Sequence, residues 1–215
     1  MDELLVSVLM ILFFAGAVLG MVSFHRRLMK QPLEILVDLV EKGVIKSSIS
    51  GYTLKGGFQG RKIFITLKSG RQKNSPEQLT VGASASLPFK CSIYSRSALL
   101  DLGSTIGLIR NVVKDIPEFQ QRYVITSADE MPVREFLLAE KRRHCVDRLL
   151  QGRSAKLVME RDSIMIIKSV RGLNLLKKLV EPSEIEAMLQ ILVELASDVE
   201  RFSGNMPSGA SGSQS

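Results

Sequence analysis

The feature that most constrains this chain is an uninterrupted apolar run near its N-terminus. Residues 4–24 include no charged side chain, and His25-Arg26-Arg27 follows at once. As an α-helix with a rise of about 1.5 Å per residue, this run would be roughly 30 Å long, which matches the hydrocarbon core of a bilayer. The sequence therefore predicts a transmembrane helix over residues 4–24.

Two other interpretations of the run fit less well. A cleaved signal peptide begins with basic residues and ends at a small-x-small site, whereas this chain begins Met1-Asp2-Glu3 and has no Ala-x-Ala pattern at the end of the run. A lipoprotein signal would need a cysteine just after the run, but the two cysteines are Cys91 and Cys145. A buried core helix usually carries a polar stripe, which this run lacks.

The charges on either side of the run predict its orientation. Two acids precede it, and Arg26, Arg27 and Lys30 follow it. Basic residues close to a span stay on the cytoplasmic side of the membrane. We therefore expect a single-pass protein of the inner membrane, with residues 1–3 outside and the rest in the cytoplasm. Two cysteines far apart in the chain fit a reducing compartment at least as well as a disulfide.

Gly16 and Gly20 form a G-x-x-x-G pair within the run. Glycines four residues apart lie on one face of a helix and let a second helix approach closely, so they are candidates for a homodimer contact. The alternative is that they have no such role, because glycine is common in membrane spans.

The net charge of +7 is unevenly distributed. Residues 25–75 contain eleven Lys or Arg against three acids, whereas the chain from residue 76 onward contains eighteen against seventeen. A basic region beside the membrane would be attracted to anionic lipid, or it is simply a solvated surface. Nucleic-acid binding is not expected, because there is no tryptophan, only 6% aromatic residues and no helix-turn-helix or zinc signature.

After the run, hydrophobic periodicity predicts a short helix, a series of strands, and then a helix, a hairpin and a last helix. Period-two alternation and turn-rich boundaries predict strands over residues 49–54, 62–68, 79–83, 89–93, 123–126, 155–160 and 163–168. Helical spacing predicts helices over residues 32–40, 129–151 and 183–202. Residues 97–115 are ambiguous, and the segment 203–215 is too polar to order itself.

Together these elements predict an α+β fold: an N-terminal transmembrane helix followed by an antiparallel-sheet domain with helices packed on one face. The predicted organisation is an external N-terminus (1–3), the transmembrane helix (4–24), a basic juxtamembrane segment with a short helix (25–46), a strand-rich half of the soluble domain (47–128), a helix-hairpin-helix half (129–202) and a disordered tail (203–215).

The sequence contains no recognisable catalytic, cofactor or metal signature. The histidines are His25 and His144, and adjacent helical residues such as His144 and Cys145 point about 100° apart, so they are poor partners for one metal ion or one nucleophilic pair. The glycine-rich segment 55–60 lacks the Lys-Ser/Thr ending of a P-loop. Segment 103–107 could instead expose backbone amides at a helix start. Both segments are interpreted as turns. We therefore assign no catalytic, cofactor-binding or metal-ligating residue.

Several short motifs in a fixed order are similar to those of uncharacterised, single-pass, membrane-anchored bacterial proteins. These motifs are Gly51-Tyr52 with Gly56, Gly60-Arg61, Glu118-Phe119, Tyr123-Val124-Ile125, and a helix with Leu138 and Arg142 or Arg143. The resemblance spans about residues 50–202 and implies an N-terminal anchor with an α+β soluble domain. It implies no catalytic residue.

The leading functional hypothesis is a non-enzymatic, membrane-anchored interaction or scaffold module that faces the cytoplasm. Its expected partners are the bilayer and either a second copy of the chain or an unidentified protein. Two alternatives stay open. One is an enzyme of unrecognised type, which would need converging ionisable residues in a deep pocket. The other is a domain that senses anionic lipid through its basic region.

Overall fold

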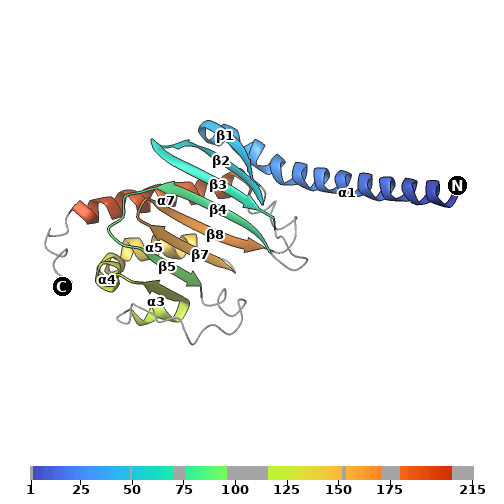
Figure 1. Ribbon diagram of the computed structural model, residues 1–215. Coiled ribbons are helices and arrows are strands. Elements are labelled where there is room, and N and C mark those ends of the chain that lie inside the picture. Colours follow the sequence, from blue (N-terminus) through green and yellow to red (C-terminus); the bar gives the residue numbers. More distant parts are fainter. Residues whose placement is uncertain are drawn as a thin grey trace, which may run out of the picture.

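The computed structural model describes residues 2–48, 50–69, 76–95, 116–151, 154–170 and 180–204. These residues form an α+β domain, built on one antiparallel sheet with helices on one of its faces, as predicted, and a long N-terminal helix that projects from it (Figure 1). The helices are α1 (Asp2–Ile35), the 3-10 helix η1 (Leu36–Leu39), α3 (Pro117–Arg122), α4 (Glu130–Leu138), α5 (Glu140–Leu149) and α7 (Pro182–Gly204). The strands are β1 (Glu41–Ser48), β2 (Gly51–Phe58), β3 (Arg61–Lys68), β4 (Glu77–Ser84), β5 (Cys91–Ser95), β6 (Tyr123–Ser127), β7 (Ala155–Glu160) and β8 (Ser163–Val170).

The eight strands are ordered β1-β2-β3-β4-β8-β7-β5-β6, and every neighbouring pair is antiparallel. The first four strands, β1 to β4, form an antiparallel meander. The predicted hairpin at 155–168 is present as β7 and β8, but it inserts between β4 and β5. Strands from both sides of residue 129 therefore belong to one sheet.

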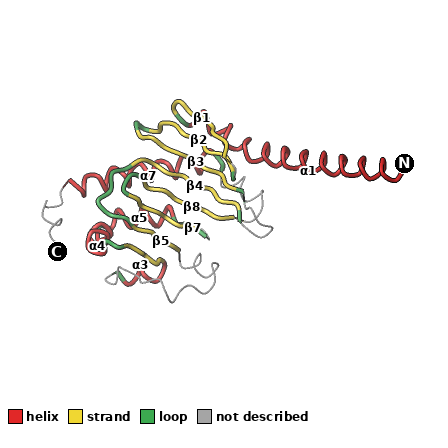
Figure 2. The backbone as a smooth tube through the Cα atoms, viewed as in Figure 1, coloured by secondary structure: helices red, strands yellow, loops and turns green. Residues whose placement is uncertain are grey.

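Alternation along the strands gives the sheet two different faces. In β3, Ile63, Ile65 and Leu67 are buried, whereas Lys62 and Lys68 on the other face are exposed. Helices α5 and α7 lie behind the sheet in Figures 1 and 2, against the face with the buried side chains. The largest fully buried side chains of this core are Phe89, Phe119, Phe136, Met29, Leu33, Leu36, Leu54, Ile65, Leu67, Leu79, Ile93 and Ile125.

Helix α1 continues well beyond the predicted apolar run. The helix expected to begin at Pro32 is instead the end of α1 followed by η1, and Pro32 lies inside α1. Met29 and Leu33 are buried, which attaches this end of α1 to the domain. Within the described part of the chain, no helix has both the length and the apolar character needed to cross a bilayer. Many side chains of residues 4–24 lie outside the described residues.

The first strands differ from the prediction at their boundaries. Strand β1, which begins at Glu41, was not predicted, because a bulge between Glu41 and Val44 breaks the period-two pattern that identifies a strand. The predicted turn over residues 55–60 is also too long, since β2 runs to Phe58. Only Gln59 and Gly60 form the turn, with φ values of 50° and 76°. Two consecutive positive φ angles are typical of a two-residue hairpin turn, and glycine adopts this conformation without strain.

The single helix predicted over 129–151 is divided into α4 and α5 at Ala139, whose ψ of 120° is extended. Arg142 donates a hydrogen bond to the carbonyl oxygen of Phe136 (3.2 Å). Arg143 donates to the carbonyl oxygens of Leu137 (2.9 Å) and Leu138 (2.7 Å). These guanidinium groups satisfy carbonyls that the next helical turn would otherwise bond, so the break leaves them with partners.

Two predicted segments lie outside the described residues. They are the ambiguous stretch 97–115, which includes the glycine-rich segment 103–107, and the tail from residue 205 onward. The last described helix, α7, continues to Gly204.

Candidate functional site

The predicted helix–helix contact lies on the projecting part of α1. Gly16 and Gly20 are exposed, and an added Cβ at either position would have no described atom within 4 Å. The side of α1 that carries the two glycines is therefore free of the described part of the domain. The homodimer contact stays a prediction.

The predicted basic residues follow on the same helix. Arg27 and Lys30 are exposed, and the side chain of Arg26 lies outside the described residues. Lys30 Nζ lies 2.7 Å from a carboxylate oxygen of Glu34. This hydrogen bond, together with the charge of Glu34, raises the pKa of Lys30. Glu34 thus offsets part of the positive charge expected beside the membrane.

The larger candidate site is the sheet face opposite the helices, which we call the open face (Figure 1). The strand registers place on it every second residue of neighbouring strands. The open face comprises Glu41, Val44, Lys46 and Ser48 of β1, Gly51, Thr53, Lys55 and Gly57 of β2, Lys62, Phe64, Thr66 and Lys68 of β3, Gln78, Thr80, Gly82 and Ser84 of β4, Ser163, Met165, Ile167 and Ser169 of β8, Lys156, Val158 and Glu160 of β7, Ser92 and Tyr94 of β5, and Val124 and Thr126 of β6.

Contacts between neighbouring strands fix side chains in the middle of the open face. The ring of Phe64 lies over Gly82, so closely that an added Cβ at Gly82 would collide with it. The hydroxyls of Thr53 and Thr66 are 3.0 Å apart and share a hydrogen bond. A half-buried surface of aromatic, β-branched and hydroxyl side chains is suited to contact with another macromolecule, because it combines apolar area with hydrogen-bonding groups.

Lysines dominate the part of the open face nearest to α1. Lys46, Lys55, Lys62 and Lys68 are exposed, and none makes an ion pair with another described residue at 4.0 Å or less. Glu41 is the one carboxylate that β1, β2 and β3 contribute to this face. This end of the open face therefore carries a net positive charge.

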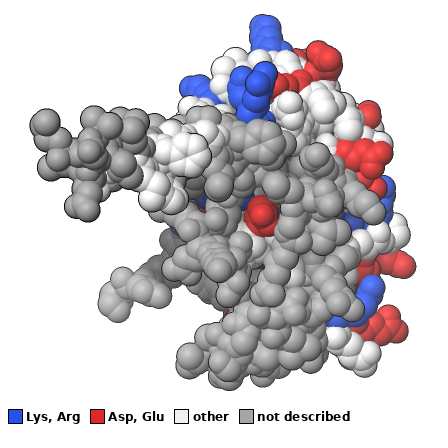
Figure 3. All heavy atoms as spheres, turned by 90° about the vertical axis from the view of Figure 1, so that its right-hand side faces the viewer, with Lys and Arg blue, Asp and Glu red and all other residues white. Residues whose placement is uncertain are grey.

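The helical layer, in contrast, includes a helix with a net negative charge. Helix α7 contains Glu184, Glu186, Glu194, Asp198 and Glu200 and a single basic residue. In Figure 3, Lys and Arg side chains gather at the top of the molecule beside Asp and Glu side chains, and Asp and Glu side chains alternate with Lys and Arg along its right-hand margin. The positive charge of the open face is thus local, and is not a uniform property of the surface.

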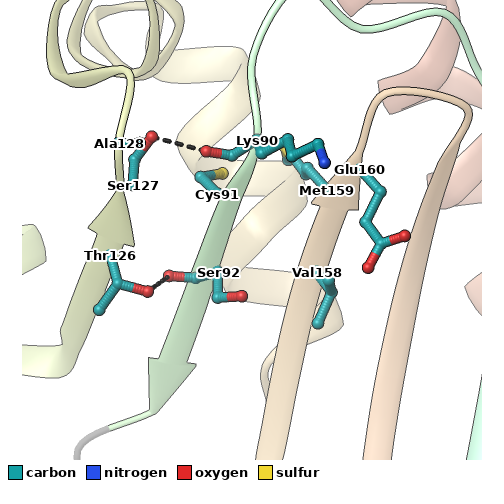
Figure 4. Close-up of a pocket in the computed structure, with 9 residues that line it drawn as sticks. All are labelled: Lys90, Cys91, Ser92, Thr126, Ser127, Ala128, Val158, Met159 and Glu160. Atoms are coloured by element: carbon teal, nitrogen blue, oxygen red, sulfur yellow. Dashed lines mark hydrogen bonds between the residues drawn. The ribbon is translucent and has the colours of Figure 1, made fainter.

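A shallow pocket of about 420 Å³ lies at the far end of the open face (Figure 4). Its lining residues come from β5, β6, β7 and the segments next to them: Lys90, Cys91, Ser92, Thr126, Ser127, Ala128, Val158, Met159 and Glu160. Thr126 donates a hydrogen bond to the carbonyl oxygen of Ser92 (3.5 Å), and Ser127 donates to that of Lys90 (2.6 Å). These hydroxyls are thus used to join strands.

The thiols of this chain are poorly suited to nucleophilic chemistry. Both cysteines are free and buried. Burial raises the pKa of Cys91 to about 12, and burial likewise raises the pKa of Cys145. Because the thiolate is the reactive form, a raised pKa lowers the reactivity of both side chains. His144 is exposed, and Cys145 is a buried core residue.

A second pocket of about 290 Å³ lies where β3 and β4 meet α7, and two of its charged residues, Arg61 and Glu200, pair with each other. Arg61 donates to both carboxylate oxygens of Glu200, at 2.9 and 2.6 Å. It also donates to Ser197 Oγ and to the carbonyl oxygen of Ser84, each at 3.1 Å. The backbone N–H of Ser86 donates to Glu200 (3.1 Å). The arrangement holds α7 on the sheet.

Another buried ionisable group lies at the β6 edge. The pKa of Tyr123 is raised to about 12, mainly by burial and in addition by the neighbouring carboxylate of Asp147. The Tyr123 ring packs against Phe119 with 4.7 Å between ring centroids, and Arg122 pairs with Asp147 at 3.1 Å. These contacts join α3 to β6 and to α5. Within the described residues, no group of three or more His, Cys, Asp or Glu side chains is placed to hold a metal ion.

The open face was not identified from sequence. The alternation of Lys62 and Lys68 with apolar residues indicated a half-buried strand, but not that lysines of three strands share one face. That grouping depends on the registers of β1 and β3 with β2, and the bulge in β1 shifts its register. A one-residue change of register would move every side chain of a strand to the other face.

No protein-family model matches this chain, and no curated protein matches it. Among solved structures, the chain is similar to the crystal structure of the mycobacterial trehalose monomycolate transport factor A, TtfA. The sequence identity is 10% and the TM-score is 0.38, over 72% of this chain and 78% of that chain. Similarity at this level carries no statement about function. The resemblance to single-pass, membrane-anchored bacterial proteins stays a prediction.

Proposed function

We propose that this chain is a single-pass, membrane-anchored interaction module of the inner membrane, with its sheet domain in the cytoplasm and without catalytic activity. The predicted span over residues 4–24 and the basic residues after it support the anchor and its orientation. The domain binds a protein partner through the open face.

One observation carries the proposed binding role. The described helices cover one face of the eight-stranded sheet (Figure 2). The other face presents lysine, threonine and apolar side chains to its surroundings. An antiparallel sheet tolerates a solvated face, but such a face is usually more uniformly polar. Phe64, Met165, Ile167 and Val124 are only partly buried here. Covering them with a partner would remove apolar area from water.

The proposal can be tested by photo-crosslinking of the full chain in its membrane. A photoreactive amino acid replaces Thr80, in the middle of the open face, or Glu135, which is exposed on α4. We expect a discrete protein adduct from position 80 and none from position 135. Equal adducts from both positions, or none from position 80, would contradict a binding role for the open face.

A further inference from the structure

Three lysines of the open face form a diagonal line across β1, β2 and β3. Lys55 is paired with Val44 on one side and with Phe64 on the other. Lys46 on β1 and Lys62 on β3 are the diagonal neighbours of Lys55, and they lie toward opposite ends of β2. Diagonal neighbours on one sheet face are roughly 7–8 Å apart. The line therefore presents three positive charges at nearly regular intervals.

The charges in this line repel one another and lack compensation among the described residues. Glu41 is paired with Gly57, which is itself paired with Lys62, so one carboxylate lies beside the end of the line. It is not within 4.0 Å of a described lysine nitrogen. Like charges on neighbouring strands destabilise a sheet slightly. A ligand that carries negative charge would remove this repulsion.

Apolar positions flank the same line. Val44 is 54% exposed and Phe64 is partly exposed, and both are paired directly with Lys55. Gly57 has no side chain, and the side chain of Glu41 covers its position. The surface thus combines a row of charges with adjacent apolar contacts. Protein segments have this mixed chemistry.

We infer that the open face binds an acidic protein segment, whose carboxylates pair with Lys46, Lys55 and Lys62. This inference rests on the proposed function and specifies the chemistry of the partner. In an extended chain, alternate side chains are on one face and about 6.7 Å apart. A segment with Asp or Glu at every second residue therefore matches the spacing of the three lysines.

The apolar positions beside the lysines favour a protein segment over a lipid surface as the occupant. Headgroups of anionic lipid would supply charge alone, whereas a protein segment supplies charge together with side chains that can pack on Val44 and Phe64. A second copy of the open face is disfavoured as well, because two surfaces with unpaired lysines repel each other.

Binding is measured with the full chain in nanodiscs of uncharged lipid. The probe is a short fluorescent peptide of alternating Glu and Thr, and the control peptide has Gln in place of Glu. The test variant is Lys55→Gln/Lys62→Gln. The matched control is Arg148→Gln/Arg201→Gln, which removes the same charge from exposed positions on α5 and α7.

We expect the Glu peptide to bind and the Gln peptide to fail, with binding weakened as the salt concentration rises. The test variant should weaken binding about tenfold, and the control variant less than about twofold. Equal weakening by both variants, or no binding of the Glu peptide, would overturn the inference. It would also be overturned if vesicles with anionic lipid, but not the peptide, protected the three lysines from acetylation. The proposed function would survive these results if position 80 still formed its protein adduct.

Discussion

The contact between Phe64 and Gly82 shows how single residues shape the open face. The two residues are paired across β3 and β4, and the aromatic ring occupies the space that a side chain at position 82 would need. Glycine inside a strand normally weakens it, because it has no side chain to pack and loses more conformational entropy on folding. Here the ring covers the exposed backbone of Gly82, which compensates for that loss.

This contact gives the first prediction. Gly82→Ala should lower the free energy of unfolding by about 1–3 kcal/mol, because the new methyl group displaces the Phe64 ring. The loss should be measured by urea unfolding of the full chain in detergent. In a Phe64→Ala background the same change should cost little or be stabilising, since the collision is gone. An equal loss in both backgrounds would show that the ring does not occupy this position.

Arg142 joins three parts of the helical layer. Its guanidinium lies 4.8 Å from the ring centroid of Phe136 and 4.9 Å from that of Phe202, and it donates a hydrogen bond to Asp198 (3.0 Å). A planar, delocalised cation can stack on two rings while its edge donates hydrogen bonds, and an ammonium group cannot do both.

We therefore expect Arg142→Lys to be costly although it keeps the charge. The free energy of unfolding should fall by about 2 kcal/mol, through lost stacking and lost hydrogen bonds to Asp198 and Phe136. The matched control is Arg148→Lys on the same helix, at an exposed position, which should change stability by less than about 0.5 kcal/mol. If both variants unfold at the same urea concentration, Arg142 does not have this structural role.

Among the elements, α7 depends most visibly on an ion pair. Arg61 opens β3 and Glu200 lies near the end of α7, so their bidentate contact fixes the helix to the sheet. The Arg61 guanidinium holds the pKa of Glu200 below its usual value through a hydrogen bond, and the backbone N–H of Ser86 adds to this effect. The pair is partly exposed, so its contribution is modest.

The lowered pKa of Glu200 predicts how the free energy of unfolding depends on pH. The carboxylate of Glu200 stabilises the fold by about 1 kcal/mol above the unfolded pKa of about 4.3, and this contribution disappears as the pH falls through the lower folded pKa. The difference in unfolding free energy between the native chain and Glu200→Gln should therefore shrink below about pH 4. Urea unfolding at several pH values measures it, and a difference that grew in acid would have the wrong sign.

The projecting part of α1 gives a prediction of its own. If Gly16 and Gly20 form a helix–helix contact, Gly16→Ile/Gly20→Ile should abolish self-association of the full chain in membranes, because close approach of the backbones is lost. The control is Val18→Ile/Val22→Ile, which lies on the opposite side of the helix at 100° per residue. Crosslinking in native membranes measures the effect. Self-association that persists in the glycine variant would exclude this contact.

At the scale of elements, local pattern predicted most strands and the last helix but not their arrangement. The period-two alternation of residues 62–68 identified β3, and the turn at Arg161 and Asp162 identified the β7–β8 hairpin. The insertion of that hairpin between β4 and β5 depends on contacts far apart in sequence. The break at Ala139 was missed because the sequence there favours helix, and the side chains of Arg142 and Arg143 compensate for the break only in the folded chain.

The same distinction applies to the candidate site. Composition showed that the excess of positive charge lies in residues 25–75, which include β1, β2 and β3. It could not show that Lys46, Lys55 and Lys62 lie in one line, because this follows from strand register. The anchor, in contrast, could be predicted from the sequence alone. A helix that spans a bilayer must have a certain length and apolar character, and both can be recognised in the sequence.

At the scale of the whole molecule, three regions have separate proposed roles. The N-terminal helix holds the protein in the membrane, the helical layer and the sheet form the folded body, and the open face binds a partner beside the membrane. Tethering would raise the effective concentration of the open face near other membrane-bound proteins, so that even a modest electrostatic affinity would give frequent contact.

The measurement that tests this placement most directly is protease digestion of the sheet domain on the two sides of the inner membrane. The domain should be protected in intact spheroplasts and digested in inverted membrane vesicles, while the chain resists extraction by alkaline carbonate. Digestion in intact spheroplasts, release without detergent, or a mature chain that begins near residue 25 would contradict a cytoplasmic domain held by an uncleaved anchor.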